Sequence, residues 1–192
     1  MSRNQNRVQY SLDSGNIKNL SDKELNMILR ATDELVMSAG RSMLTKVLKG
    51  SKEKKILEFQ LDKCPAYGVF ADFSIQEISN RVDWAIENGF IAIEYSGKLP
   101  MLIFTLKGWE IEKQNYTNEL FEQLCKVAAS DSADERKAFI ETLKTRNRQV
   151  ILLLLEKIAK SGTETLISFL EEWKRCEVKK VSSAIDNVIN RM

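Results

Sequence analysis

Two short β-rich runs in an otherwise helical sequence limit the folds that this chain can adopt. The runs, Phe90–Tyr95 (FIAIEY) and Met101–Thr105 (MLIFT), flank the polar segment SGKLP. This pattern is typical of a β-hairpin around a glycine-containing loop. Ahead of the runs, apolar residues recur with helical spacing in four segments, over residues 21–35, 41–49, 52–61 and 75–88. After the leading helix over residues 21–35, the order is helix, helix, turn, helix, hairpin. This order predicts a winged helix in which the hairpin is the wing.

Helix starts are marked by S-x-x-E capping boxes, in which the Ser and Glu side chains satisfy free backbone N–H groups reciprocally. The sequence contains four of them, at Ser21/Glu24, Ser74/Glu77, Ser132/Glu135 and Ser161/Glu164. Beyond Gly108 the pattern is entirely helical, with segments expected over residues 118–129, 133–160 and 164–189. The last two are joined at Ser161-Gly162, which favours an antiparallel helical hairpin.

These patterns predict a mostly α fold with a small antiparallel β wing, of the α+β class, followed by a C-terminal helical hairpin or bundle. Three parts are expected along the chain. Residues 1–20 would form a flexible N-terminal segment, residues 21–113 a winged-helix domain with a leading helix, and residues 114–192 a helical extension.

Composition argues against several classes of function. The chain has no histidine, and its three cysteines, Cys64, Cys125 and Cys176, are far apart in the sequence, so no metal site or cofactor is expected. Without histidine the commonest general base is missing, and we expect no enzymatic activity. Unclustered cysteines fit a reducing, cytoplasmic location. The longest apolar run, Val150–Leu155, is far shorter than the roughly 20 residues that span a membrane.

The most informative segment is KVLKGSKEKK, from Lys46 to Lys55, which carries five lysines against one glutamate. A glycine between two helices allows the backbone to approach a ligand, and a helix start presents free N–H groups that attract anions. The segment therefore predicts a contact with nucleic-acid phosphates. A lysine-rich helix end that is merely solvated is the alternative reading. The candidate DNA-binding residues here are Lys46, Lys49, Gly50, Ser51, Lys52, Lys54 and Lys55.

The sequence LTKVLKGSKEKKI resembles the L-x-x-V-L-R-G-S-K-x-K-K-I signature of the RecQ C-terminal (RQC) domain family. The resemblance continues at Tyr67-Gly68, Asp83-Trp84, Asn88-Gly89-Phe90 and Leu102–Gly108 (LIFTLKG). It implies that the G-S-K turn grips the backbone of a DNA duplex, with Lys49, Ser51 and Lys55 on phosphates. It also implies that the wing meets the end or fork of the duplex, through Tyr95, Ser96, Gly97, Lys98 and Leu99.

The chain departs from the family pattern in two respects. Several members carry an aromatic residue at the wing tip that separates the strands, whereas here the tip is Ser96–Leu99 and Tyr95 lies at the wing base. The sequence also lacks a G-x-x-x-x-G-K-[ST] motif, so no helicase motor is expected.

The helix expected over residues 75–88 is acidic, with Glu77, Asp83 and Glu87 against Arg81 alone. Phosphates on both sides of a groove would repel such a helix, so contact with DNA should follow the backbone rather than the bases. A second basic cluster, Lys144, Arg146 and Arg148, either extends the DNA contact or is a solvated helix face.

The sequence therefore predicts a non-enzymatic, DNA-binding adaptor for duplex or junction DNA in repair, replication or recombination, nucleoid-associated if bacterial. Residues 133–190 would form a homodimer or recruit a protein partner. The alternative is a winged helix that serves as a protein–protein interaction module or a transcriptional regulator.

Overall fold

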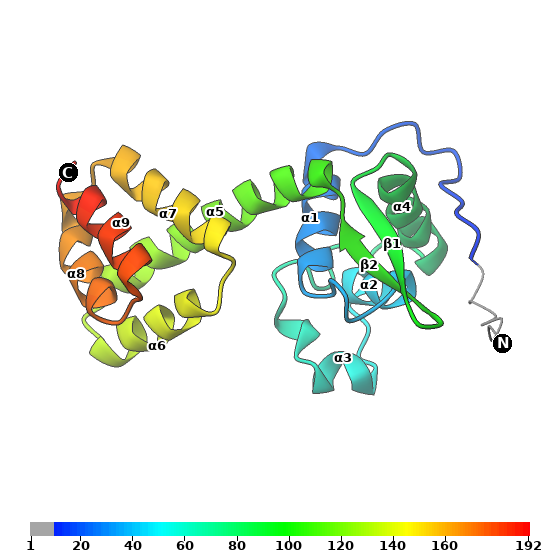
Figure 1. Cartoon of the computed structure of the whole chain (residues 1–192). Helices are drawn as coiled ribbons and strands as arrows, with labels where there is room; N and C mark the ends of the chain where they lie inside the picture. Colours follow the sequence, from blue (N-terminus) through cyan, green and yellow to red (C-terminus); the bar gives the residue numbers. More distant parts are fainter. Residues whose placement is uncertain (1–9) are drawn as a thin grey trace, which may run out of the picture. The chain divides into compact units, whose positions relative to one another are not determined.

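The computed structural model describes residues 10–192 and divides the chain into two compact units, residues 1–112 and 113–192. The described part of the first unit follows the expected order of helices and hairpin (Figure 1). Its elements are α1 (Asp22–Asp33), α2 (Arg41–Lys49), α3 (Lys54–Glu58), a 3₁₀ turn (Leu61–Lys63), α4 (Ile75–Glu87), β1 (Ile91–Ser96) and β2 (Leu99–Phe104). The predicted fold class, mostly α with a small antiparallel wing, is confirmed.

Local capping sets the starts of α1 and α4. Ser21 and Ser74 each accept a hydrogen bond from the backbone N–H of the glutamate three residues later, and that glutamate accepts one from the serine N–H. Both complete capping boxes lie where the sequence predicted them. The apolar faces of α1, α2 and α4 meet in one core around residues such as Ile28, Leu44 and Val82, all fully buried.

The third helix is shorter than predicted. It ends at Glu58, and Gln60 adopts a left-handed conformation (φ 55°) that breaks the backbone before Leu61. The helical spacing predicts an inward Leu57, but this side chain is 48% exposed beside the fully buried Ile56, and Phe59 is 69% exposed.

The wing is a two-stranded antiparallel hairpin in which Ile91 pairs with Phe104 and Ser96 with Leu99. One edge of β2 continues onto the loop between α1 and α2. The N–H of Met37 donates to the carbonyl of Leu102 (3.0 Å), and the N–H of Leu102 donates to the carbonyl of Ala39 (3.0 Å). The base of the wing is therefore joined to the chain just ahead of α2.

The N-terminal segment was predicted to be flexible over residues 1–20, and residues 1–9 lie outside the described part. From Tyr10 onward the segment is held on the first unit rather than projecting freely. The indole N–H of Trp84 donates to the carbonyl of Lys18 (3.2 Å), and the N–H of Asp13 donates to the Asp83 carboxylate (2.9 Å).

The helices of the second unit are more numerous than predicted, because two expected helices are each divided, while the first is longer than expected. Helix α5 (Leu106–Ala128) begins well before the expected residue 118 and crosses the division between the units. The segment expected as one helix over 133–160 breaks at Thr145–Asn147, and the one over 164–189 breaks at Cys176–Val178. The resulting elements are α6 (Ala133–Lys144), α7 (Arg148–Ser161), a 3₁₀ turn (Glu164–Leu166), α8 (Ile167–Arg175) and α9 (Lys179–Ile189).

The predicted capping box at Ser161 is wrong, because Ser161 is the last residue of α7 and Gly162 ends that helix in a left-handed conformation. The apolar faces of the short helices bury one another, with Leu154, Leu170 and Trp173 fully enclosed. In the described residues no helix has the length and apolar character needed to cross a membrane.

Candidate nucleic-acid interface

The Gly50-Ser51 corner, where α2 ends, is the centre of the predicted interface. Gly50 has a left-handed backbone (φ 78°), and its N–H donates to the carbonyl of Val47 (3.0 Å). The N–H of Ser51 donates to the carbonyl of Lys46 (3.0 Å). These bonds close the end of α2 in the way that a left-handed glycine commonly does. The two amide groups are therefore used within the protein, and the expectation that they point at a ligand is wrong.

The lysines of the corner divide into two groups. Lys46 pairs with Glu53 (2.7 Å between Nζ and Oε1). The ammonium group of Lys49 donates to the carbonyls of Ala71 (2.5 Å) and Phe73 (2.8 Å), which lie in the loop before α4. Both cations are committed to contacts that position the domain, although both were predicted to bind DNA.

The remaining lysines of the corner face solvent. Lys52, Lys54 and Lys55 are exposed, and Lys54 makes only an exposed ion pair with Glu58 at 3.4 Å. For Lys52 and Lys55 the described part of the chain offers no hydrogen bond or ion pair, and exposed i,i+4 pairs such as Lys54–Glu58 are weak. These three ammonium groups are the ones that a phosphate can reach.

Ser51 and Gly50 are fixed by contacts with the loop after Pro65. The hydroxyl of Tyr67 donates to the carbonyl of Ser51 (3.0 Å). An added Cβ on Gly50 would lie 3.0 Å from the Cα of Gly68, so the two glycines touch backbone to backbone. The Tyr67-Gly68 pair noted in the sequence therefore shapes the corner.

The wing tip presents a second set of predicted residues. Ser96, Gly97, Lys98 and Leu99 are all exposed, with Leu99 57% exposed. Gly97 and Lys98 form the two-residue connection between the strands, which requires the positive φ that Gly97 adopts (62°). Tyr95 lies below the tip, where its ring stacks on that of Tyr10 at 6.3 Å between centroids.

The corner and the wing border adjoining hollows of the surface. One hollow is lined by residues of the wing, including Leu99 and Pro100, and the other by residues of the corner, including Gly50 and Ser51. They share Arg41, Ser42 and Lys46, at the start of α2 and along it. The structure thus brings part of each predicted set to one groove, namely Lys46, Lys49, Gly50 and Ser51 of the corner and Leu99 of the wing.

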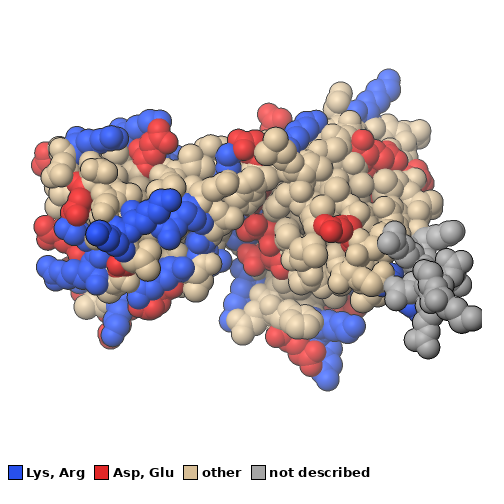
Figure 2. All heavy atoms as spheres, viewed as in Figure 1, with Lys and Arg blue, Asp and Glu red and all other residues tan. Residues whose placement is uncertain are grey.

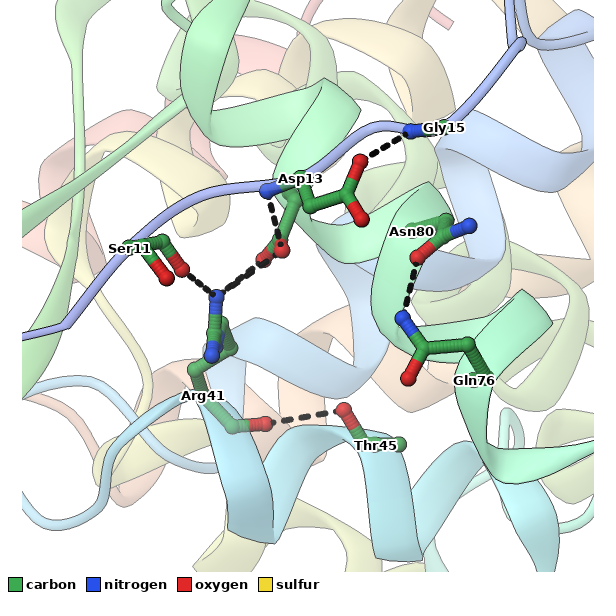
Figure 3. Close-up of polar contacts among 8 residues, drawn as sticks. Ser11, Asp13, Gly15, Arg41, Thr45, Gln76 and Asn80 are labelled. Atoms are coloured by element: carbon green, nitrogen blue, oxygen red, sulfur yellow. Dashed lines mark hydrogen bonds and ion pairs between the residues drawn. The ribbon is translucent and has the colours of Figure 1, made fainter.

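The start of α2 is a part of this groove that the sequence reasoning missed. Arg41 donates to both carboxylate oxygens of Asp83 at 2.8 Å and to the carbonyl of Ser11 at 2.9 Å (Figure 3). Burial raises the pKa of Asp83, while the N–H of Asp13 and the charge of Arg41 oppose that rise. The signal available in the sequence was Gly40-Arg41, a helix start without a side-chain cap or a carboxylate in its first turn.

Helix α4 offers the groove no free cation. Its single basic residue, Arg81, pairs with Glu24 (3.0 Å) and lies over the ring of Phe73, 4.0 Å from the ring centroid. Glu77 and Glu87 are exposed on the same helix. The helix keeps the acidic character that the sequence predicted, because Arg81 and Asp83 are both engaged in ion pairs and the exposed charges that remain are Glu77 and Glu87.

The described residues contain no group of three or more Cys, Asp or Glu side chains that could hold a metal ion. The three cysteines differ in exposure. Cys64 is buried, Cys125 is partly buried and Cys176 is exposed.

The comparisons with known proteins match the part of the chain that contains the corner and the wing. A family model described as RQC domain matches residues 18–127. Among curated proteins, the ATP-dependent DNA helicase RecQ of Bacillus subtilis (strain 168) is 32% identical over 113 residues. This match covers 59% of the chain but only 19% of that helicase, so the chain spans about a fifth of the length of this relative. No solved structure matches the chain.

Proposed function

The chain belongs to the RQC domain family, as the LTKVLKGSKEKKI segment predicted, and from this premise we propose that it binds DNA through the phosphate backbone. The observation that carries the proposal is the exposure of cations at the corner and at the wing tip. Lys52 and Lys55 follow Ser51 in the chain and Lys98 lies at the wing tip, and all three are exposed, although none of them lines either hollow. Exposed ammonium groups such as these can neutralise the phosphates of a duplex.

The proposed contact reads the backbone rather than the base sequence. A recognition helix that enters the major groove must pass between two rows of phosphates. Helix α4 would bring exposed Glu77 and Glu87 there, while Arg81 remains held by Glu24. Phosphate contacts fix the position of a protein on DNA but carry no sequence information directly, so we expect little preference among sequences.

The wing gives the proposed site its preference for DNA shape. Leu99 and Lys98 project together at the tip, so an apolar side chain and a cation meet the DNA at one place. A terminal base pair or a fork exposes the flat face of a base, against which Leu99 can pack. Since the tip has no aromatic ring to stack between bases, we propose that the wing holds an end or junction without separating the strands.

In this proposal the chain is a non-enzymatic adaptor in DNA repair, replication or recombination. A homodimer or a protein partner of residues 133–190 would contact the outer faces of α6–α9, because the inner faces are buried against one another.

Charge reversal tests the proposed contact. The variant Lys52→Glu/Lys55→Glu is compared with the control Lys18→Glu/Lys23→Glu, which changes the net charge by the same amount. Lys18 lies ahead of α1 and Lys23 in its first turn, and both are exposed. Fluorescence anisotropy measures the affinity for a labelled duplex over a series of salt concentrations. Each lost phosphate contact reduces the slope of log K against log salt by about 0.9, so the first variant should lose about 1.8 and the control should lose none.

The same experiment separates DNA binding from a protein-interaction module. A parent protein that shows no anisotropy change with any duplex, fork or single strand would refute the proposed function. Equal weakening in both variants would show that general charge, rather than the corner, attracts the DNA. Lys49 is left unchanged, because its contacts with Ala71 and Phe73 make it part of the fold.

A further inference from the structure

A second basic surface lies at one end of the C-terminal unit. The break between α6 and α7 and the break between α8 and α9 border one hollow. Its lining includes Lys144, Arg146 and Arg148 from the first break and Glu177 and Val178 from the second. Lys179 and Lys180 follow directly as the first residues of α9. We call Lys144, Arg146, Arg148, Lys179 and Lys180 the basic patch.

All five cations of the basic patch are exposed. Lys144 pairs with Glu141 (2.6 Å), and Arg146 lies over the ring of Tyr116, 5.5 Å from the ring centroid. Arg148, Lys179 and Lys180 have no hydrogen bond or ion pair within residues 10–192. Figure 2 shows Lys and Arg side chains gathered on the viewed face of this unit, where α9 lies in front in Figure 1.

The carboxylate nearest the hollow does not cancel this charge by pairing with it. Glu177 accepts hydrogen bonds from the indole N–H of Trp173 (2.9 Å) and from the backbone N–H of Val178 (3.3 Å). These bonds hold it to its own segment of the chain. The patch therefore remains open to an external anion.

The helix starts at the patch differ in charge from those of α1, α4 and α6, although α2 and α3 also begin with a basic residue and have no carboxylate in the first turn. Helices α1, α4 and α6 have carboxylates in the first turn, where the helix dipole favours negative charge. Helix α7 begins with Arg148 and α9 with Lys179 and Lys180, and neither has a carboxylate in its first turn. Two neighbouring helices thus accept an unfavourable charge at the same hollow, and a bound anion would remove that penalty.

We propose that the basic patch is a second contact for the phosphate backbone of a nucleic acid. The proposal rests on the proposed function, since the patch would bind the same class of ligand as the corner. A phosphodiester chain suits the patch because it carries several negative charges, and the patch offers five exposed cations at the two breaks. Few large apolar side chains accompany them, with Val178 and Leu152 exposed among those described, so the surface lacks the apolar centre of a protein interface.

Charge reversal at the two helix starts tests this patch in the full chain. Arg148→Glu/Lys179→Glu is compared with Lys126→Glu/Lys137→Glu, exposed lysines of α5 and α6 that do not line the hollow. The patch variant should bind a labelled duplex more weakly, with a salt slope reduced by about 1.8, and the control should match the parent. The melting temperature of the patch variant should not fall below that of the parent, because glutamate suits a helix start better than arginine or lysine. A patch variant that melts as the parent does and binds as the parent does would overturn the proposal.

Cys176 gives a readout that is independent of the corner. It lines the hollow and is exposed, whereas Cys64 is buried and burial raises the pKa of the Cys125 thiol, so a maleimide should label Cys176 first. Saturating duplex should slow this labelling in the parent and in the control variant, but not in the patch variant.

The labelling result also separates the two proposals. If Lys52→Glu/Lys55→Glu leaves affinity and Cys176 protection unchanged, the corner assignment fails and the patch assignment stands. If the parent binds duplex while Cys176 labels at its free rate, the patch assignment fails and the corner assignment stands. Protection of Cys176 by phosphatidylserine vesicles but not by duplex would also overturn the patch assignment, in favour of binding to a membrane surface.

Discussion

Replacing Gly50 by alanine should destabilise the first unit more than the same change at another left-handed helix end. Gly50 has φ 78°, a region that costs an L-residue about 1–2 kcal/mol relative to glycine. The new Cβ would lie 3.0 Å from the Cα of Gly68, closer than an ordinary van der Waals contact. The substitution therefore combines backbone strain with a collision between two chain segments.

The collision cannot be relieved cheaply, because the atom that must move belongs to the backbone. The N–H of Gly68 donates to the carbonyl of Val47 (3.0 Å), and that of Phe70 donates to the carbonyl of Leu48 (2.9 Å), so the loop is bonded to the end of α2. Overpacking of this kind costs about 1–3 kcal/mol. Added to the strain, the expected loss in the free energy of unfolding is about 2–5 kcal/mol.

Gly89→Ala is the matched control. Gly89 follows the end of α4 with φ 70°, and an added Cβ there would have no neighbour within 4 Å. It should lose only the strain contribution, about 1–2 kcal/mol. In thermal unfolding followed by circular dichroism, Gly50→Ala should melt at least about 4 °C below Gly89→Ala, given about 4–8 °C per kcal/mol for a domain of this size. Equal melting temperatures would refute the idea that the contact between Gly50 and Gly68 fixes the corner.

Three further substitutions test other parts of the structure. Lys49→Met should lower the free energy of unfolding, measured by urea titration, by about 1–2 kcal/mol, because the hydrogen bonds of Lys49 to two carbonyls are lost. Lys52→Met should change it by less than about 0.5 kcal/mol. Equal effects of the two substitutions would contradict the structural role of Lys49. Partial burial opposes ionisation of Glu24, but hydrogen bonds from Ser21 and Arg81 outweigh it and hold the pKa below its usual 4.5. The stabilising effect of the ionised Glu24 is therefore present above pH 4.5 and is lost as the pH falls through the lower pKa of the folded protein. Glu24→Gln should reduce the free energy of unfolding at neutral pH and approach the parent in acid. A constant difference between the two proteins over the whole pH range would contradict this prediction. Leu99→Ala should weaken binding to blunt or forked DNA more than to a closed circular duplex in competition assays, and equal weakening would exclude an end-sensing wing.

Local sequence signals predicted the first unit well. The bounds of α2 and the capping boxes of α1 and α4 follow from a few neighbouring residues, so the sequence contains what is needed to place them. The shortened α3 could not be read in this way. Leu57 faces outward on this short helix, next to the fully buried Ile56, although its spacing is that of a buried residue.

The sequence predicted which candidate residues would lie together at the end of α2, but not the contacts of each side chain. Lys46 to Lys55 lie where the sequence placed them, beside the groove shared with the wing. The partners of Lys49 are carbonyls 22 and 24 residues further along the chain, and no local pattern indicates such contacts. Likewise, no glycine or proline marks the breaks before α7 and α9, and the Asn147 side chain that caps α7 is the one local signal for a helix starting at Arg148.

The hydrogen bonds between the wing and the loop at Met37–Ala39 have a mechanical consequence. Because β2 pairs with β1 along one edge and Leu102 bonds to this loop along the other edge, the hairpin can bend freely only toward its tip at Ser96–Leu99. A load applied to the tip by a DNA end would pass through Leu102 into the chain immediately ahead of Gly40. The force would then reach α2, at whose far end the lysine corner lies. The wing tip and the lysine corner are therefore mechanically coupled through β2, the Met37–Ala39 loop and α2.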